Sequence, residues 1–237
     1  MYMPVPYVLM KFHIGGIPKT TYFQPDASWR PVLGPGLWSL QLLAVLPALI
    51  FAAAVAWLWS YLIPVRDMLS SFDVIMPIVR GVVHLTAGMA PVKMVPGVAG
   101  LISLAVVFPL IIIAVAVYAL FHELVHLSVH PRVGMSERSI LGVWPSKMVP
   151  FAYYNGEVSL LRYLTILVMP LIIISFVPIL VCGILGRASG LLAVVSIVNV
   201  LGSSGDIFML GLITSQVPWN AKIRGQGGQG GGTFWRL

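Results

Sequence analysis

The pentapeptide His122-Glu123-Leu124-Val125-His126 places two imidazoles and one carboxylate within a single helical turn and a half. Histidines at positions i and i+4 lie about 40° apart around a helix axis and one turn apart along it, so both can bind one Zn²⁺. Glu123 can then act as the general base that accepts a proton from the attacking water. An HExxH sequence on a helix therefore predicts a zinc hydrolase.

A catalytic zinc needs a third protein ligand and an open position for water. His130 continues the same helix face, but it lies about 12 Å along the axis from His122, whereas zinc–nitrogen bonds are about 2 Å. The other acidic residue deep in an apolar segment is Asp206. We expect Asp206 to be the third ligand, with helix tilt or unwinding at Gly202 and Gly205 absorbing the difference in depth between the two helices. The alternative for Asp206 is a helix cap or an ion pair with a loop arginine.

Asn199 lies about two helical turns before Asp206. Its amide could bind substrate or steady an oxyanion, and a packing hydrogen bond between helices is the alternative. For the HExxH histidines, the alternative is a pair hydrogen-bonded to neighbouring helices without a metal. Imidazoles and carboxylates inside an apolar span are costly unless they are paired or coordinated, which favours the metal site.

The elements that must position these residues are membrane segments. Of the 237 residues, 59% are hydrophobic and 9% are charged, and the mean hydropathy is +0.97. A soluble domain has about 25% charged and about 45–50% apolar residues, so much of this surface must face lipid. The basic residues are scattered, which argues against nucleic-acid binding. The one cysteine, Cys182, excludes a disulfide framework.

Four segments have the length of about 20 apolar residues that a bilayer core requires. They run approximately over Leu37–Ile63, Gly100–Val129, Leu160–Leu185 and Gly190–Val217. The last two are separated by Gly186–Ser189 only, so they are expected to form a tight antiparallel hairpin.

The connections between these spans add two smaller features. Met68–Met89 is apolar but contains charged residues, and we expect an interfacial or re-entrant helix there. In Pro131–Ser159, the segments Val143–Trp144 and Phe151–Tyr154 are strand candidates. The predicted fold is an all-α polytopic membrane protein of about four transmembrane helices, with an interfacial or re-entrant helix and a short, partly extended cytoplasmic loop.

The distribution of Lys and Arg predicts the orientation. With four spans, the N-terminus, the Pro131–Ser159 loop and the C-terminus share one side, which holds most of the 14 basic residues. That side has Lys11, Lys19, Arg30, Arg132, Arg138, Lys147, Arg162, Lys222, Arg224 and Arg236, against Arg66, Arg80, Lys93 and Arg187 on the other. We expect a multi-pass protein of the cell membrane with both termini cytoplasmic. No cleavable signal is expected in residues 1–36.

The predicted organisation is a cytoplasmic N-terminal segment (residues 1–36), a membrane metallopeptidase domain (37–217) and a Gly-rich cytoplasmic tail (218–237). Within it, the chain resembles the DUF3267 family of zincin-type membrane peptidases, which is similar in turn to the site-2 intramembrane metalloproteases. The resemblance covers roughly residues 114–236. It rests on the HExxH sequence, Glu157-Val158-Ser159 with Arg162 ahead of a third span containing Pro170, Asn199 followed by Ser204-Gly205-Asp206, and Gly232-Thr233-Phe234-Trp235.

The resemblance implies His122, His126 and Asp206 as zinc ligands and Glu123 as catalytic base. The site-2 proteases use an Asp-Gly pair for the third ligand, whereas Gly205 precedes Asp206 in this chain.

These features predict a zinc-dependent intramembrane endopeptidase that hydrolyses peptide bonds of membrane-associated proteins or peptides. Its expected partners are that substrate and the lipid bilayer, without nucleic acid, and the sequence specifies no oligomeric state. The Pro131–Ser159 loop would pair with an unwound substrate segment by strand addition. One alternative is a membrane zinc hydrolase of a lipidated substrate, because HExxH does not specify the bond. The other is a non-catalytic metal-binding membrane scaffold.

Overall fold

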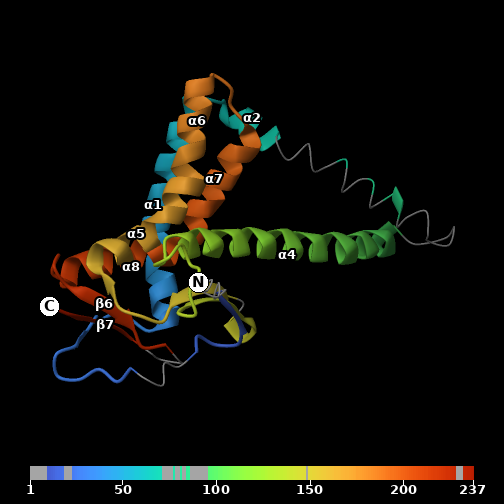
Figure 1. Ribbon diagram of the computed structural model, residues 1–237. Coiled ribbons are helices and arrows are strands. Elements are labelled where there is room, and N and C mark those ends of the chain that lie inside the picture. Colours follow the sequence, from blue (N-terminus) through green and yellow to red (C-terminus); the bar gives the residue numbers. More distant parts are fainter. Residues whose placement is uncertain are drawn as a thin grey trace, which may run out of the picture.

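The computed structural model describes residues 10–18, 23–70, 77, 81, 84–85, 96–147, 149–227 and 232–237. Helices make up most of this part of the chain (Figure 1). They are α1 (Leu37–Ser60), α2 (Val65–Ser70), α4 (Pro96–Ser128), α5 (Leu160–Pro170), the π-helical segment η3 (Leu171–Phe176), α6 (Val177–Leu185), α7 (Gly190–Gly202) and α8 (Ser204–Gln216).

Three continuous helical segments are long and apolar enough to cross a membrane: Leu42–Ser60, Val107–Ser128 and Leu160–Leu185. Helices α7 and α8 are bent by 50° at the intervening Ser203 and count as a fourth span if the pair crosses as one broken span. Whether the chain has the four predicted membrane spans therefore depends on whether α7 and α8 cross the membrane together. The break falls between Gly202 and Gly205, where unwinding was expected. Most of the predicted Met68–Met89 helix lies outside the described residues.

One face of α1 packs against α7 and α8. The residues Ala44, Ala48, Ala52, Val55 and Trp59 recur every three or four positions and are all buried, which is the pattern of a helix with one contact face. Small side chains at this face let neighbouring helices approach closely. The opposite side of α1 is exposed and apolar, as expected of a surface that faces lipid. It carries Leu42, Leu43, Leu46, Leu49 and Ile50.

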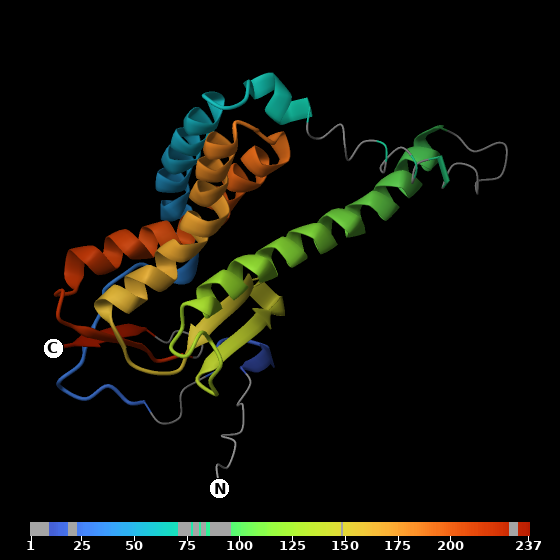
Figure 2. The same ribbon diagram turned by 45° about the horizontal axis from the view of Figure 1, so that its top comes forward.

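Helix α4 differs from the others in how little of it is covered. Of the 18-residue apolar window that marks the candidate span Val107–Ser128, only 6% is buried. Its N-terminal half extends away from α1, α6 and α7 in both views (Figures 1 and 2). Its C-terminal turns, by contrast, contact α5, β3 and β4. The end of α4 that carries the HExxH sequence is therefore the end embedded in the rest of the protein.

Two small sheets correct the expectation of an all-α fold. In the first, of order β1-β3-β4, β1 (Lys11–Ile14) pairs parallel with β3 (Ser139–Trp144), and β3 pairs antiparallel with β4 (Val149–Tyr154). The two strand candidates in the loop are thus confirmed, and a short 3₁₀ turn, η2 (Pro145–Lys147), connects them.

The second sheet has the order β2-β7-β6-β5 and joins both ends of the chain. Its strands are β2 (Arg30–Pro31), β7 (Thr233–Arg236), β6 (Lys222–Gly225) and β5 (Val158–Ser159). Sequence reasoning missed β1, β2, β5, β6 and β7. The pairings bring the N-terminal segment, the Pro131–Ser159 loop and the C-terminal residues together (Figure 2). Such contacts are possible only if these three segments lie on the same side of the membrane. The division of the chain at residues 36 and 217 stays a prediction.

Candidate metal centre

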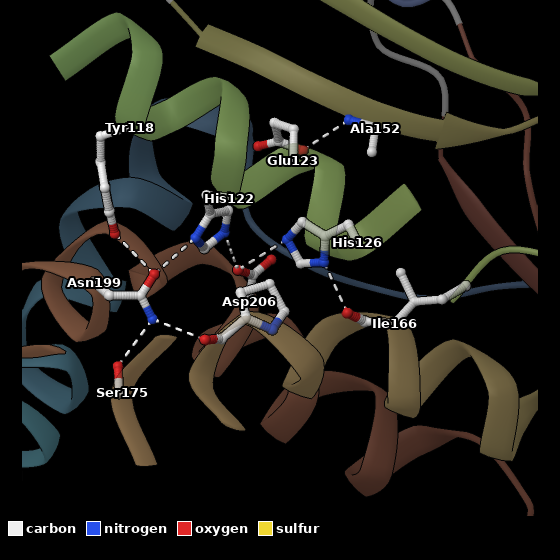
Figure 3. A network of polar contacts seen from close by, with 10 residues as sticks. Tyr118, His122, Glu123, His126, Ala152, Ile166, Ser175, Asn199 and Asp206 are labelled. Carbon is white, nitrogen blue, oxygen red and sulfur yellow. Dashed lines mark hydrogen bonds and ion pairs between the residues drawn. The ribbon is translucent and has the colours of Figure 1, made fainter. Parts of the chain in front are cut away.

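Four side chains from two helices meet where the end of α4 crosses the start of α8 (Figure 3). His122 and His126 are each only 6% exposed, and their rings lie 4.8 Å apart. The Oδ2 atom of Asp206 lies 3.2 Å from Nε2 of His122 and 3.3 Å from Nε2 of His126. The structure therefore brings the three expected ligands to one point.

The second nitrogen of each imidazole is held by an oxygen atom. Nδ1 of His126 lies 2.7 Å from the carbonyl oxygen of Ile166, and Nδ1 of His122 lies 3.0 Å from Oδ1 of Asn199. Because both oxygens can only accept, each Nδ1 carries the proton. In its neutral form, each imidazole then directs the lone pair of its Nε2 towards Asp206, which is the tautomer that metal-bound histidines use.

This arrangement fits a cation. A proton on each Nε2 would make these contacts ion pairs with Asp206. With both imidazoles neutral, the two nitrogen lone pairs at 3.2 and 3.3 Å from one carboxylate oxygen would repel it unless a cation lay between them. Ligands that surround zinc tetrahedrally at about 2.0–2.1 Å lie about 3.3–3.4 Å from one another. The observed separations match that spacing, so His122, His126 and Asp206 have the distances of a zinc-type site.

Glu123 belongs to the same cluster, and its carboxylate points towards Ala152 of β4 (Figure 3). One ligand atom each from His122, Glu123 and His126 lie within 4.8 Å of one another, so this group could hold a metal ion. However, the backbone N–H of Ala152 in β4 donates to Oε2 of Glu123 at 2.7 Å. Since Asp206 contacts both Nε2 atoms, it is the better third ligand, and Glu123 is left beside the site.

Pro170 explains why a backbone carbonyl is available to His126. In a continuous α-helix the N–H of residue 170 would donate to the carbonyl of Ile166, but proline has no N–H. The π-helical segment η3 begins directly after Pro170, and such segments are frequent at functional sites. The proline thus leaves the Ile166 oxygen free for the imidazole of His126.

Asn199 lies behind His122, and its amide is fully used. Its Oδ1 accepts from the hydroxyl of Tyr118 at 2.7 Å as well as from His122. Its Nδ2 donates to the Pro170 carbonyl at 3.0 Å and to Oγ of Ser175 at 2.9 Å. Because Asn199 is fully buried, no group remains for the expected contact with substrate or an oxyanion. Its place in the structure is that of a residue orienting His122.

His130 lies outside this cluster, consistent with its exclusion as a ligand. It is 2% exposed, its Nδ1 has no hydrogen-bond partner in the described part of the chain, and its ring lies 5.5 Å from that of Tyr154. Burial, and secondarily the nearby His126, lowers the pKa of His130 to about 4. It is therefore neutral near neutral pH.

A cavity of about 300 Å³ adjoins the centre. Glu123, His126 and Asp206 line it together with residues of β4, and Arg224 of β6 lines it as well. The cavity gives the candidate centre a space in which a substrate segment can lie.

Sequence reasoning missed Tyr118, Ala152, Ile166 and Ser175. Tyr118 lies one turn before His122 on the same helix face and could have been found from that spacing. The others act through backbone atoms or through a neighbouring helix, and no residue type marks them.

The residues that build this centre also match a known family. The family is DUF3267. Its model, described as Putative zincin peptidase, matches residues 114–221, which include every residue of the cluster. The DUF3267 match supports a metalloprotease, and the zincin description implies zinc. Searches of curated proteins and of solved structures found no match, so the likeness to site-2 proteases stays a prediction.

Proposed function

We propose that this protein is a zinc-dependent, membrane-embedded endopeptidase that hydrolyses peptide bonds of membrane-associated proteins. The observation that carries the proposal is the meeting of His122, His126 and Asp206 at tetrahedral ligand spacing with Glu123 beside them. The intramembrane setting is supported by the position of both histidines in the apolar window Val107–Ser128. The basic side with both termini would be cytoplasmic.

In this proposal each residue of the cluster has a defined part. His122, His126 and Asp206 hold the zinc, with the two histidines oriented by Asn199 and Ile166. Zinc in this site would act as a Lewis acid on the scissile carbonyl and favour deprotonation of water near neutral pH. Glu123 accepts the proton of the attacking water and delivers it to the leaving amine.

The contact between Glu123 and Ala152 also positions the base. Oε2 is held by β4, while Oε1 accepts no hydrogen bond from any described residue, so one oxygen of Glu123 is available for water. The carboxylate is thereby kept in one orientation next to the ligands, and orientation of this kind is a large part of enzymatic rate enhancement.

We propose that substrate binds along the outer edge of β4, the edge that does not pair with β3. β4 is the terminal strand of the β1-β3-β4 sheet, and the N–H of Ala152 points away from β3 towards Glu123. A substrate segment that adds to this edge would run directly past the centre. Strand addition supplies backbone hydrogen bonds without requiring a fixed substrate sequence.

The first experiment is the zinc content per chain of the detergent-purified protein, purified without chelator. We expect about one zinc in the wild type, strong loss in His126→Ala and Asp206→Ala, and full retention in Glu123→Gln. Proteolysis of membrane peptides should disappear in Glu123→Gln. Zinc bound equally well without Asp206 would contradict the ligand set. Zinc bound normally with no hydrolysis of peptides by the wild type would favour the scaffold.

A further inference from the structure

Arg224 is a positively charged residue of the cavity without an anionic partner. It lies in β6 opposite Phe234 of β7, and its guanidinium lies 4.4 Å from the ring centroid of Phe23. Its Nε is buried and unpartnered. None of its guanidinium nitrogens forms a hydrogen bond or an ion pair with a residue that the structure describes.

The neighbouring basic residues on the same sheet are different. Lys222 and Arg236 both form ion pairs with Glu157, at 3.3 and 2.8 Å. Arg30 lies over the ring of Trp235 and is not among the residues that line the cavity. Arg224 is thus the cavity-lining guanidinium that no described carboxylate neutralises.

The chemistry of a guanidinium indicates what Arg224 would bind. It presents a planar fork of N–H donors that matches a carboxylate through two parallel hydrogen bonds. Stacking on Phe23 fixes the plane of that fork, so less rotamer entropy is lost when an anion binds.

The size of the cavity between Arg224 and the candidate metal centre restricts where that carboxylate can lie in the substrate. The carbonyl of Gly225, next to Arg224, accepts from the hydroxyl of Tyr153 at 2.8 Å, and Tyr153 adjoins the Ala152 that holds Glu123. A sphere of the cavity's volume, about 300 Å³, would be about 8 Å across. An extended chain advances about 3.3–3.6 Å per residue, so this space accommodates about two residues.

We propose that Arg224 binds a carboxylate of the substrate located within about two residues of the scissile bond. The carboxylate can belong to an Asp or Glu side chain, as in endopeptidase cleavage, or to a free C-terminus, in which case cleavage would be of the carboxypeptidase type, since both offer the same pair of oxygens. This assignment rests on the proposed peptidase function, to which it adds a substrate preference.

A binding experiment tests the site independently of hydrolysis. Detergent-purified Glu123→Gln protein is mixed with random hexapeptide pools that contain Glu or Gln, each with a free or an amidated C-terminus. Retained peptides are counted by mass spectrometry. We expect at least tenfold enrichment of peptides carrying a carboxylate, because a hydrogen bond to a charged group is worth about 1.5–3 kcal/mol. The pool that is enriched identifies the side chain or the C-terminus as the source.

Arg224→Gln in the same background should abolish the enrichment. Arg30→Gln, which removes the same charge from β2, two strands away in the same sheet, should preserve it. Equal retention of acidic and neutral pools overturns the proposal. So does an Arg224→Gln variant that loses binding to phosphatidylserine vesicles but keeps the peptide preference, since the guanidinium would then bind lipid headgroups.

Cleavage by the wild-type protein separates this proposal from the function on which it rests. Acidic peptides retained by Glu123→Gln protein but not cleaved by the wild type would uphold the carboxylate site and contradict the peptidase. Cleavage without any preference for a nearby carboxylate would uphold the peptidase and contradict the role of Arg224.

Discussion

Replacing Pro170 with alanine would test whether the proline sets the metal affinity. The new N–H at position 170 can donate to the carbonyl of Ile166, which the Nδ1–H of His126 occupies at 2.7 Å. Loss of such an outer partner of a metal-bound histidine lowers metal affinity about 10–100-fold. A carbonyl oxygen has two lone pairs and can accept twice, so we expect the lower end, about tenfold, or about 1.4 kcal/mol.

Folding stability should change in the opposite direction. Alanine restores one helical hydrogen bond, which contributes about 0.5–1.5 kcal/mol, and fills a helix position where proline is unfavourable. The metal-free Pro170→Ala protein should therefore be at least as stable as the metal-free wild type. A change that merely damaged the fold would lower both stability and metal affinity.

The assay is competition of the purified protein with a chromogenic chelator for zinc, alongside thermal unfolding of the metal-free form. Pro178→Ala is the matched control, because that proline lies in the same span, and the carbonyl four residues before it, of Ile174, contacts Oγ of Ser196 and not a histidine. Unchanged zinc affinity in Pro170→Ala, or an equal loss in Pro178→Ala, would refute the reasoning.

Three further outcomes are expected. Ala152→Pro should retain both the fold and zinc binding, because the N–H of Ala152 is not used in the β3–β4 ladder. The variant should nevertheless cleave peptides more slowly, because Glu123 loses its hydrogen-bond donor. Ala152→Val, which keeps the N–H, should cleave at the wild-type rate. Asn199→Ala should lower zinc affinity about 10–100-fold in chelator competition, because His122 loses its partner; equal affinity would contradict the orienting role. The folded-state pKa of His130 is about 4, below its unfolded value of about 6.5, so its stabilising effect is complete above about pH 6.5 and is lost as the pH falls towards 4. Unfolding curves of His130→Phe should then depend less on pH over that window than those of the wild type.

The sequence was sufficient to predict that His122, His126 and Asp206 would meet, as they do at the candidate metal centre. HExxH spacing fixes the relative placement of His122 and His126 through helix geometry alone. Asp206 could be found because a carboxylate in an apolar span is costly and needs a partner. Tyr118 could have been predicted from helix spacing as well, since it lies one turn before His122 on the same helix face.

The parts that could not be predicted depend on contacts distant in sequence. The strands β2 and β5 have two residues each, too few to show alternation, and they form because partner strands reach them from the other end of the chain. The interaction of Ala152 with Glu123 uses a backbone N–H, which every residue type except proline offers. Arg224 resembles any other surface arginine until the β6–β7 pairing places it in the cavity.

The order in which the chain is synthesised adds a consequence of the second sheet. All helices that carry the metal ligands precede β6 and β7, and β7 pairs with β2 from the beginning of the chain. A nascent chain can therefore assemble its metal centre before the wall containing Arg224 exists. Selection among substrates would begin only after residues 222–236 have left the ribosome and joined the two ends, so maturation of the enzyme would be a late, post-insertion event.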